Sequence, residues 1–413
     1  MKLLVYGINF SPELTGIGKY TGDMAAWLAA RGHAVRVVTA PPYYPDWKLG
    51  PGYKPARWSS ETWRGVQIWR CPLWVPAEPG GISRLLHLAS FALSSLPVVL
   101  RHVFWRPDVV WVVAPSLLCA PAALAASRLA GARAWLHIQD FEVDAAFDMG
   151  LLKGARLRRL VLGAERWLLR RFARVSTISP RMVERLHAKG VEPARQMLFP
   201  NWVDMRDFAA PPETVRHGAA DYRAQLEIPP DAVVALYSGN MGAKQGLEVL
   251  ADVAARLAGN AAVWFVFCGT GVGRANLLAR CAALPQVRFL DLQPAQRLPE
   301  LLGMADIHLL PQRADAADLV MPSKLTGMLA SGRPVVAGAH PHTGLAEVVR
   351  HCGVVVPPED AGAFAQAIGF LANDATLRNN LGAAGKSHAL EHMEQSRILE
   401  QFERALKETM DPC

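Results

Sequence analysis

The glycines that follow the first apolar run are the residues whose types and spacing point most directly to ligand chemistry. The run Leu3-Leu4-Val5 passes through Gly7 into a loop that carries Gly16-Ile17-Gly18. We expect a strand, a flexible loop and a helix, which would place backbone N–H groups at the carboxyl edge of a parallel sheet, where phosphate or sugar oxygens bind. The spacing differs from the dinucleotide fingerprint, because Tyr20 follows Gly18 and no third glycine stands at the required offset. A turn that only reverses the chain is the alternative.

The composition is that of a folded protein with more than one domain. The chain has 413 residues, of which 51% are hydrophobic and 19% charged, so we predict two domains rather than one core. No run of about 18 uninterrupted apolar residues occurs, so no membrane-spanning helix is expected. The N-terminus lacks a signal-peptide pattern, so we expect a cytoplasmic protein. The six cysteines lie far apart, which argues against zinc sites and a disulfide framework.

Positive charge is concentrated in the first half of the chain. Residues 1–205 hold 26 Lys and Arg against 14 Asp and Glu, and eight of these cations lie in Lys153–Arg174 with the single acid Glu165. Interleaved apolar residues make this segment a basic amphipathic helix, which suits an anionic membrane surface. The alternative is a helix packed on a sheet with a solvated basic face. No nucleic-acid-binding module accompanies the charge, so no nucleic acid partner is expected.

A second apolar segment, Gly80–Val103, is interrupted by Arg84, His87 and Pro97. These interruptions make it too broken to span a bilayer, so we expect a buried helix of the first domain, with a helix that dips into a membrane as the alternative.

Strand-like apolar runs alternate with helical segments along the whole chain. They are Leu3–Gly7, Val35–Thr39, Val66–Cys71, Val109–Val113, Ala134–Ile138 and Val175–Ile178, and then Val233–Ser238, Val263–Cys268, Val287–Leu290, Ile307–Leu310, Val335–Ala337 and Val354–Val356. This alternation indicates parallel sheets covered on both faces. We predict an α/β protein of two Rossmann-like doubly wound domains, 1–205 and 206–390, that face each other across a deep cleft, with a helix in 391–413 packing back on the first domain.

Several segments together resemble a known family. They are GINFSPELTGIGKYTGDMAAWLAARGHAVRVVTAPPYYPDW, LHIQDFEVDAAFDMGLL, STISPRMVERL, FPNWVD, LYSGNMGAKQGLE and MPSKLTGMLASGRPVVA. The chain resembles the family-four glycosyltransferases of the GT-B fold, and among them the WcaI-type enzymes of colanic-acid biosynthesis. The resemblance implies a retaining transfer of a sugar from a nucleotide diphosphate, GDP-fucose or another GDP- or UDP-hexose, to a lipid-linked oligosaccharide. It implies no metal and no cofactor. Together with the basic segment Lys153–Arg174, it leads us to expect a peripheral position on the inner face of the cytoplasmic membrane.

The resemblance also implies roles for residues of the first domain. Gly16 and Gly18 would approach the donor diphosphate and the acceptor through backbone N–H groups. His137, at a strand end, matches the position of a histidine near the reacting sugar, and Asp140 would orient that histidine or the acceptor hydroxyl. Without the family pattern, His137 would be interpreted as a structural histidine.

In the second domain the resemblance implies a donor site. Gly239, Asn240 and Lys244 match a loop that contacts the diphosphate, where many family members carry arginine in place of Asn240. Lys324 is a second cation, and Gly269-Thr270-Gly271 would contact the base, although a plain turn explains that motif equally well. Glu347 would contact donor hydroxyls or be a solvated helix acid.

The sequence departs from the broad family at two positions. Leu319 and Gly327 stand where glutamates would hold sugar hydroxyls. Ser323, Lys324 and Leu325 would instead bind phosphate at a helix start, as in the family's polysaccharide branch. Two other functions remain open: a nucleotide-sugar epimerase of the same fold, and a non-catalytic membrane-associated assembly protein.

Overall fold

The computed structural model describes residues 1–13, 16–77, 80–148, 154–208, 212–242, 245–314 and 322–410. The chain forms two compact units. We call residues 1–200 with 397–413 the N-terminal unit, and residues 201–396 the C-terminal unit. The division at Pro200 comes slightly before the predicted boundary at residue 205.

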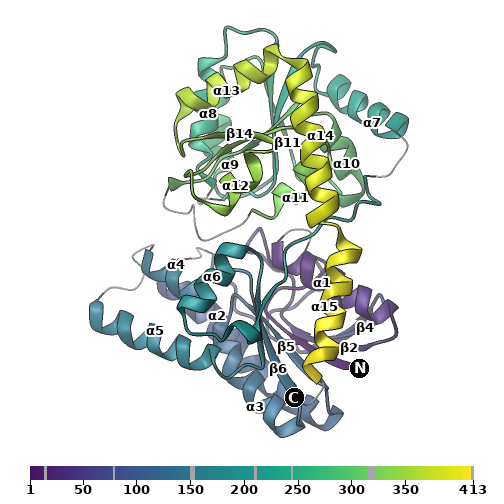
Figure 1. Cartoon of the computed structure of the whole chain (residues 1–413), viewed down its shortest axis with the longest axis vertical. Helices are drawn as coiled ribbons and strands as arrows, with labels where there is room; N and C mark the ends of the chain where they lie inside the picture. The colour runs from purple at the N-terminus through teal and green to yellow at the C-terminus, as the bar shows by residue number, and fades with distance from the viewer. Residues whose placement is uncertain are drawn as a thin grey trace. The chain divides into compact units, whose positions relative to one another are not determined.

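The N-terminal unit is built on one sheet (Figure 1). Its strands are β1 (Lys2–Tyr6), β2 (Ala34–Thr39), β3 (Ser59–Trp63), β4 (Val66–Arg70), β5 (Val109–Ala114), β6 (Arg133–Ile138), β7 (Arg174–Thr177) and β8 (Gln196–Leu198). They lie in the order β3-β4-β2-β1-β5-β6-β7-β8, and all pairs are parallel except β3 with β4. The six buried strands match the predicted apolar runs, whereas the edge strands β3 and β8 were not predicted because they are short or polar.

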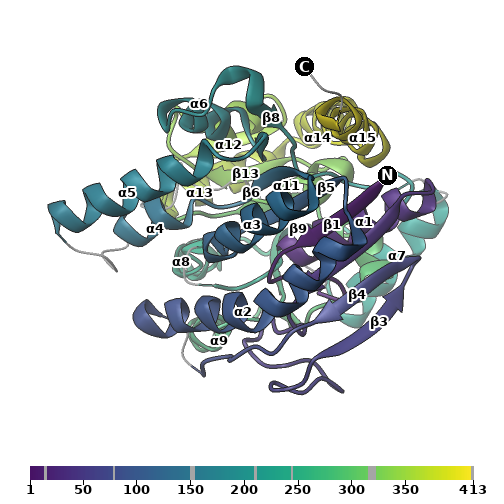
Figure 2. The same cartoon turned by 90° about the horizontal axis from the view of Figure 1, so that it is seen from below.

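Helices cover both faces of this sheet (Figure 2). They are α1 (Gly16–Ala30), α2 (Gly81–Arg101), α3 (Ala120–Ala130), α4 (Glu142–Asp148), α5 (Ala155–Leu169), α6 (Pro180–Ala188) and α15 (Gln395–Met410), with the short 3-10 helices η1 (His102–Trp105), η2 (Leu117–Cys119) and η3 (Pro193–Arg195). α15 packs on this unit through Phe402, whose ring stacks on Phe199 at 4.2 Å and meets Trp135 edge-on at 5.2 Å. It starts at Gln395, later than the predicted residue 391, because α14 extends to His392.

The C-terminal unit repeats the architecture with six parallel strands. They are β9 (Val233–Ser238), β10 (Val263–Cys268), β11 (Val287–Leu290), β12 (Ile307–Leu310), β13 (Val335–Gly338) and β14 (Gly353–Val356), in the order β11-β10-β9-β12-β13-β14. The helices are α7 (Pro212–Gln225), α8 (Glu248–Arg256), α9 (Arg274–Cys281), α10 (Leu298–Gly303), α11 (Lys324–Ala330), α12 (Gly344–Val349), α13 (Ala361–Asn373), α14 (Ala375–His392) and the 3-10 helix η5 (Ala295–Arg297). Both units are therefore Rossmann-like and α/β, as predicted.

Strand order defines a switch point in each sheet. In the C-terminal unit the chain moves from β9 to β10 in one direction and later continues from β12 to β13 in the other. In the N-terminal unit the chain moves from β1 to β2 in one direction and later continues from β5 to β6 in the other. Ligands of doubly wound sheets bind at the carboxyl ends of the strands at such points.

The apolar segment between β4 and β5 forms one long helix with an exposed outer face, which corrects the prediction of a buried helix. Only 28% of the most apolar window of α2 is buried. On its outer face Ile82 is 76% exposed and Leu93 73%, and Phe104 of η1 is 88% exposed. By length and composition the stretch Gly81–Trp105 could cross a membrane, contrary to the expectation of no such helix.

The inner face of α2 nevertheless belongs to the N-terminal unit. β4 and β5 are parallel members of one sheet, so α2 must return the chain across that sheet. Phe91 and Val99 are fully buried, and Ser95 Oγ bonds to Tyr6 Oη of β1 over 2.7 Å. α2 is therefore a crossover helix whose outward side is unusually apolar.

Candidate functional site

A cation, Lys324, lies at the carboxyl edge of the C-terminal sheet. Lys324 is the first residue of α11, and its Nζ donates to Tyr237 Oη over 2.8 Å and lies 4.2 Å from the centre of that ring. Across the described part of the chain, no carboxylate pairs with this ammonium group, and burial lowers the pKa of Lys324 to about 7. An anion bound here would favour the protonated, charged form of Lys324, which burial disfavours.

The switch point of the sheet brings Lys324 against the loop that follows β9. Gly239 has φ +136°, and a Cβ at that position would lie 3.3 Å from both Lys324 Cε and Lys324 Nζ. Tyr237 Oη in turn donates to the carbonyl oxygen of Asn240 over 2.6 Å. The tertiary structure thus brings together Gly239, Asn240 and Lys324, which are three of the predicted site residues.

The loop after β10 lies directly beside the loop after β9. Gly269 has φ +141°, and a Cβ there would overlap the carbonyl oxygen of Gly239. The N–H of Met241 donates to the carbonyl of Thr270 over 2.8 Å, and a Cβ at Gly271 would lie 2.7 Å from Asn240 Oδ1. Close backbone approach therefore requires these glycines, whatever ligand they contact. Their role toward a base stays a prediction.

The other residues predicted at this site differ from one another in burial and packing. Leu325 is fully buried in a core cluster, and its N–H donates to the carbonyl of Pro322 over 3.0 Å. We therefore correct its predicted role to packing. Ser323 is partly exposed immediately before α11, and Glu347 is exposed in the first turn of α12. A Cβ at Gly327 would lie 3.2 Å from Leu302 Cδ1, so this position is shaped by helix packing. Lys244 and Leu319 lie outside the described residues.

At the switch point of the N-terminal unit, a buried carboxylate shapes the glycine loop, and the sequence reasoning missed it. Glu13 is 5% exposed and accepts hydrogen bonds from the N–H groups of Tyr43 and Tyr44, both over 3.2 Å, and from Asn9 Nδ2 over 3.0 Å. Burial raises the pKa of Glu13 to about 7. A Cβ at Gly18 would lie 2.8 Å from Glu13 Cβ. Glu13 thus joins the loops after β1 and β2 and requires glycine at position 18.

Gly16 begins α1 with φ +62°. Because α1 follows β1 along the chain, the helix starts at the carboxyl end of that strand, and the contact of its backbone N–H groups with a ligand stays a prediction. A second missed carboxylate, Glu142, accepts from the N–H groups of Ser116 and Leu117 over 2.8 and 2.9 Å. Burial raises the pKa of Glu142. Asp140 lies between β6 and α4 and is partly exposed, so its predicted role remains open. The sequence signal for Glu13 and Glu142 is weak, because each is an acid in the loop that follows a predicted strand and neither directly follows the strand end.

His137 is buried inside the sheet, which corrects its predicted catalytic role. It is 1% exposed, stacks on Trp111 at 5.3 Å, and has both ring nitrogens engaged, Nδ1 with Ser176 Oγ at 2.9 Å and Nε2 with Gln139 Nε2 at 3.0 Å. Burial lowers the pKa of His137 to about 3. The two-residue period of β6 puts His137 on the same face as Trp135, which α15 covers. We assign it the structural role that the sequence left as the alternative.

No group of three or more His, Cys, Asp or Glu side chains among the described residues is arranged to hold a metal ion. The five cysteines that the structure describes are buried and unpaired.

Comparison with known proteins now identifies the family. Residues 15–202 match the family described as "Glycosyl transferase 4-like domain", and residues 232–374 match "Glycosyl transferases group 1". The chain is 42% identical over 411 residues to a protein of Escherichia coli (strain K12) named as the colanic acid biosynthesis glycosyl transferase WcaI, covering 97% of this chain and 98% of that one. The chain belongs to the glycosyltransferases.

Solved structures confirm the GT-B fold of this glycosyltransferase. Sucrose-phosphate synthase from Thermosynechococcus elongatus superposes with a TM-score of 0.76 at 17% identity, covering 98% of each chain. HepE from Anabaena, solved in complex with UDP and glucose, superposes with a TM-score of 0.70 at 16% identity, covering 99% of this chain and 100% of that one. The family match favours a transferase over the epimerase and the assembly protein that the sequence left open.

Proposed function

We propose that this glycosyltransferase moves a sugar from a nucleotide diphosphate sugar to a lipid-linked oligosaccharide, with retention of the anomeric configuration, in the assembly of a colanic-acid-like exopolysaccharide. The name of the Escherichia coli relative supports the pathway, and the UDP and glucose bound to HepE support the class of donor. A GDP- or UDP-linked hexose, including GDP-fucose, fits this proposal.

The observation that carries the proposal is the Lys324 ammonium beside Gly239 at the switch point, which no carboxylate of the described residues neutralises. During transfer, the bond between the anomeric carbon and the diphosphate oxygen breaks and the diphosphate keeps the electron pair. The acceptor oxygen bonds to the anomeric carbon, and its proton passes to the departing diphosphate. A fixed cation stabilises the negative charge that develops on the leaving group.

In this proposal Lys324 and backbone N–H groups supply the positive charge that a metal ion supplies in other transferases, and no cofactor takes part. Activity should therefore survive dialysis against EDTA. Loss of activity in EDTA that added magnesium or manganese restores would contradict a metal-independent reaction.

We further propose that the protein docks reversibly on the anionic inner face of the cytoplasmic membrane. The surface of α5 supports this. Two of its apolar side chains, Leu160 and Trp167, are 72% and 57% exposed. The exposed arginines of the same helix are Arg156, Arg158, Arg159 and Arg166. The one acid of this helix, Glu165, is buried and pairs with Lys189. The outward face of the helix is therefore basic and apolar, a combination that binds anionic lipid interfaces.

The exposed face of α2 lies on the same side of the N-terminal sheet as α5. The crossovers β4 to β5 and β6 to β7 run in the same direction through the strand order, and right-handed crossovers moving in one direction place their helices on one face. The apolar face of α2 and the basic face of α5 can thus contribute to one docking surface.

The deciding experiment incubates the purified protein with a panel of GDP- and UDP-hexoses and with lipid-linked oligosaccharide acceptors extracted from membranes. Transfer that requires one donor, with the product linkage in the configuration of the donor, is the expected result. Isomerisation of the donor without an acceptor, or no reaction with any donor while the protein is folded, would contradict the proposal.

A further inference from the structure

The C-terminal unit contains a pocket at the opposite edge of its sheet from Lys324. Its lining includes Pro230 just before β9, Gly303 before β12, and Ser331 and Arg333 before β13, so it lies at the amino ends of the strands. The pocket has a volume of about 530 Å³, within the range of small-molecule sites. It is distinct from the proposed donor site, which lies at the carboxyl ends.

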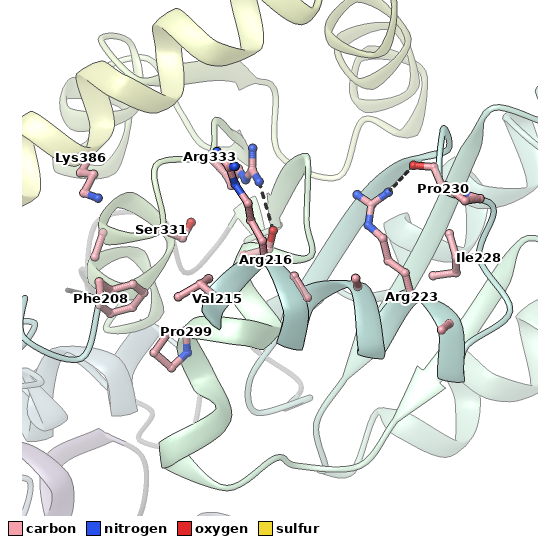
Figure 3. Close-up of a pocket in the computed structure, with 15 residues that line it drawn as sticks. Phe208, Val215, Arg216, Arg223, Ile228, Pro230, Pro299, Ser331, Arg333 and Lys386 are labelled. Carbon is pink, nitrogen blue, oxygen red and sulfur yellow. Dashed lines mark hydrogen bonds between the residues drawn. The ribbon is translucent and has the colours of Figure 1, made fainter. Parts of the chain in front are cut away.

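Local sequence explains why this space is open. α7 turns Ala219, Ala220 and Ala224 toward the pocket, and these small side chains leave room that larger ones would fill. Val215, Ile228 and Pro299 add apolar walls (Figure 3). The pocket can therefore accommodate an uncharged body beside a charged group.

The charges that line the pocket are all of one sign. Its fifteen lining residues include Arg216 and Arg223 of α7, Arg333, and Lys386 of α14, and include no Asp or Glu (Figure 3). This contrasts with the chain around it, since residues 206–413 carry 18 Lys and Arg against 22 Asp and Glu. Where such cations have no acidic partner, their clustering costs electrostatic free energy that a bound anion would relieve.

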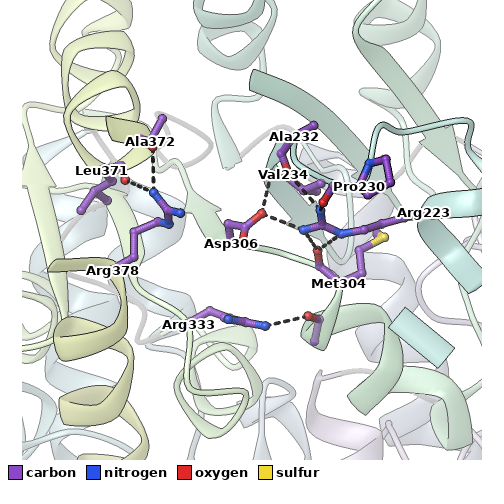
Figure 4. A network of polar contacts seen from close by, with 11 residues as sticks. Arg223, Pro230, Ala232, Val234, Met304, Asp306, Arg333, Leu371, Ala372 and Arg378 are labelled. Atoms are coloured by element: carbon purple, nitrogen blue, oxygen red, sulfur yellow. Dashed lines mark hydrogen bonds and ion pairs between the residues drawn. The ribbon is translucent and has the colours of Figure 1, made fainter. Parts of the chain in front are cut away.

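The four cations differ in how many contacts they already make within the protein, and Figure 4 shows the contacts of Arg223 and Arg333. Arg223 already has partners within the protein. Its guanidinium donates to Asp306 over 2.7 Å and to the carbonyls of Met304 and Ala232 over 2.8 and 2.9 Å. Arg333, by contrast, makes one hydrogen bond within the described residues, to the carbonyl of Gly303 over 3.2 Å. A guanidinium has five N–H donors, so most of those on Arg333 remain available.

Arg216 and Lys386 are exposed at the pocket, and neither forms an ion pair with any residue of the described ranges. Burial, together with the positive charges of Arg223, Arg378 and Arg216, lowers the pKa of Arg333, and the negative charge of Asp306 opposes this effect. An anion between Arg216, Arg333 and Lys386 would relieve the repulsion and occupy the free donors.

We propose that this pocket binds a phosphorylated small molecule, with a phosphate or diphosphate group held by Arg216, Arg333 and Lys386 and an uncharged body against the apolar wall. The guanidinium fork of Arg333 matches phosphate oxygens bidentately. The proposal does not depend on the proposed transfer reaction, because the two sites lie at opposite edges of the sheet and share no residue.

The first test is calorimetric titration of the full chain with sodium pyrophosphate at constant ionic strength. The double variant R216Q/K386Q removes two exposed cations and should fold normally, and we expect it to weaken pyrophosphate binding at the pocket by about tenfold or more. The matched control R256Q/R404Q removes two exposed arginines elsewhere and should bind as the unaltered protein does. Equal affinity of R216Q/K386Q and the unaltered protein would overturn the proposal.

Pyrophosphate can also bind at the donor site, so a second variant separates the two. Lys324→Met should remove the donor-site component and leave the component that R216Q/K386Q abolishes. If all pyrophosphate binding disappears in Lys324→Met, the pocket binds no anion and the proposal is wrong, whereas the proposed function would be unaffected.

The same titration distinguishes two sources of the phosphate. Glucose 1-phosphate and UDP represent soluble metabolites, and monomeric dihexanoyl phosphatidic acid represents a lipid headgroup. If one class of probe binds more tightly than the other and R216Q/K386Q loses that binding, the result supports the site and identifies the class of phosphate that it binds. Failure of every phosphorylated probe, pyrophosphate included, to bind measurably would overturn it.

Discussion

Lys324 is the residue whose ionisation connects the fold to the proposed chemistry. We expect Lys324→Met, which preserves length and packing, to lower kcat/KM for the donor by about 10²-fold or more, because a cation at a developing diphosphate contributes a few kcal/mol. Lys324→Arg should retain more activity than Lys324→Met. Unchanged donor kinetics in a folded Lys324→Met protein would remove this residue from the site.

The lowered pKa of Lys324 also predicts how donor binding depends on pH. With a pKa of about 7 in the free protein, Lys324 loses its proton as the pH rises above 7. Binding of an anionic donor to the charged form then requires that Lys324 take up a proton from the solution. We expect donor affinity to fall above pH 7, by at most about tenfold per pH unit. Titration of a nucleotide sugar between pH 6 and 9 measures this effect, and in Lys324→Met the dependence should vanish.

We expect His137 to affect stability rather than catalysis. Its pKa is lowered to about 3 in the folded protein, so below pH 6.5 the unfolded chain takes up a proton that the folded chain does not. The free energy of unfolding should therefore fall as pH decreases from about 6.5 toward 3, by up to about 1.4 kcal/mol per pH unit for this residue. Burial and nearby Arg333 lower the pKa of His308 to about 3, and it acts in the same direction.

Urea unfolding at pH 7 and pH 5 tests this assignment. His137→Asn should lower the free energy of unfolding at pH 7, and it should reduce the further loss of that free energy between pH 7 and pH 5. The control His342→Asn, at an exposed position, should change neither quantity. The folded His137→Asn protein should keep its donor KM. A large loss of turnover without any loss of stability would restore the catalytic interpretation.

At the scale of elements, α5 should govern electrostatic docking on membranes. We expect R156E/R159E/R166E to abolish co-sedimentation with phosphatidylglycerol vesicles at low salt, because each basic residue near such a surface contributes about 1 kcal/mol. Arg170 is left unchanged because it donates to the carbonyl of Gly190. The control R57E/R133E/R404E makes the same charge change at exposed positions outside α5 and should bind more strongly than the α5 variant.

The outer face of α2 should contribute the part of docking that salt does not screen. Ile82→Ser, Leu93→Ser and Phe104→Ser together remove exposed side chains without opening the core. We expect this triple variant to lose the vesicle binding that persists at high salt, where ion pairing is screened. If high-salt binding is the same as in the unaltered protein, the apolar face of α2 does not enter the lipid interface.

At the scale of the whole molecule, the last helix completes the first unit. Phe402 is fully buried against Phe199, Trp111 and Trp135. We expect Phe402→Ala to lower the free energy of unfolding by about 3–5 kcal/mol, whereas Phe370→Ala, at a position that is 60% exposed, should change it little. Equal effects in thermal or urea unfolding would show that α15 does not stabilise the unit.

The agreement between sequence and structure is closest where a local pattern is sufficient. Buried parallel strands are continuous apolar runs bounded by turn residues, so the bounds of β9, β10, β11 and β12 coincide with the predicted runs. Polar β3 was missed because its only support is antiparallel pairing with β4. α2 was judged buried because its apolar content, and not the direction of each side chain, was read from the sequence.

The sequence by itself determined the two α/β units and the family, and it supplied most of the glycines and cations of the proposed donor site, because periodicity, turn chemistry and motif spacing are local properties. Only the tertiary structure decided which side chains meet. It buried His137 beneath α15, placed Lys324 against Gly239, turned Glu165 inward to pair with Lys189, and gathered Arg216, Arg333 and Lys386 around one pocket. These outcomes depend on contacts between residues far apart in the chain, and burial and charge pairing arise only when such residues pack together.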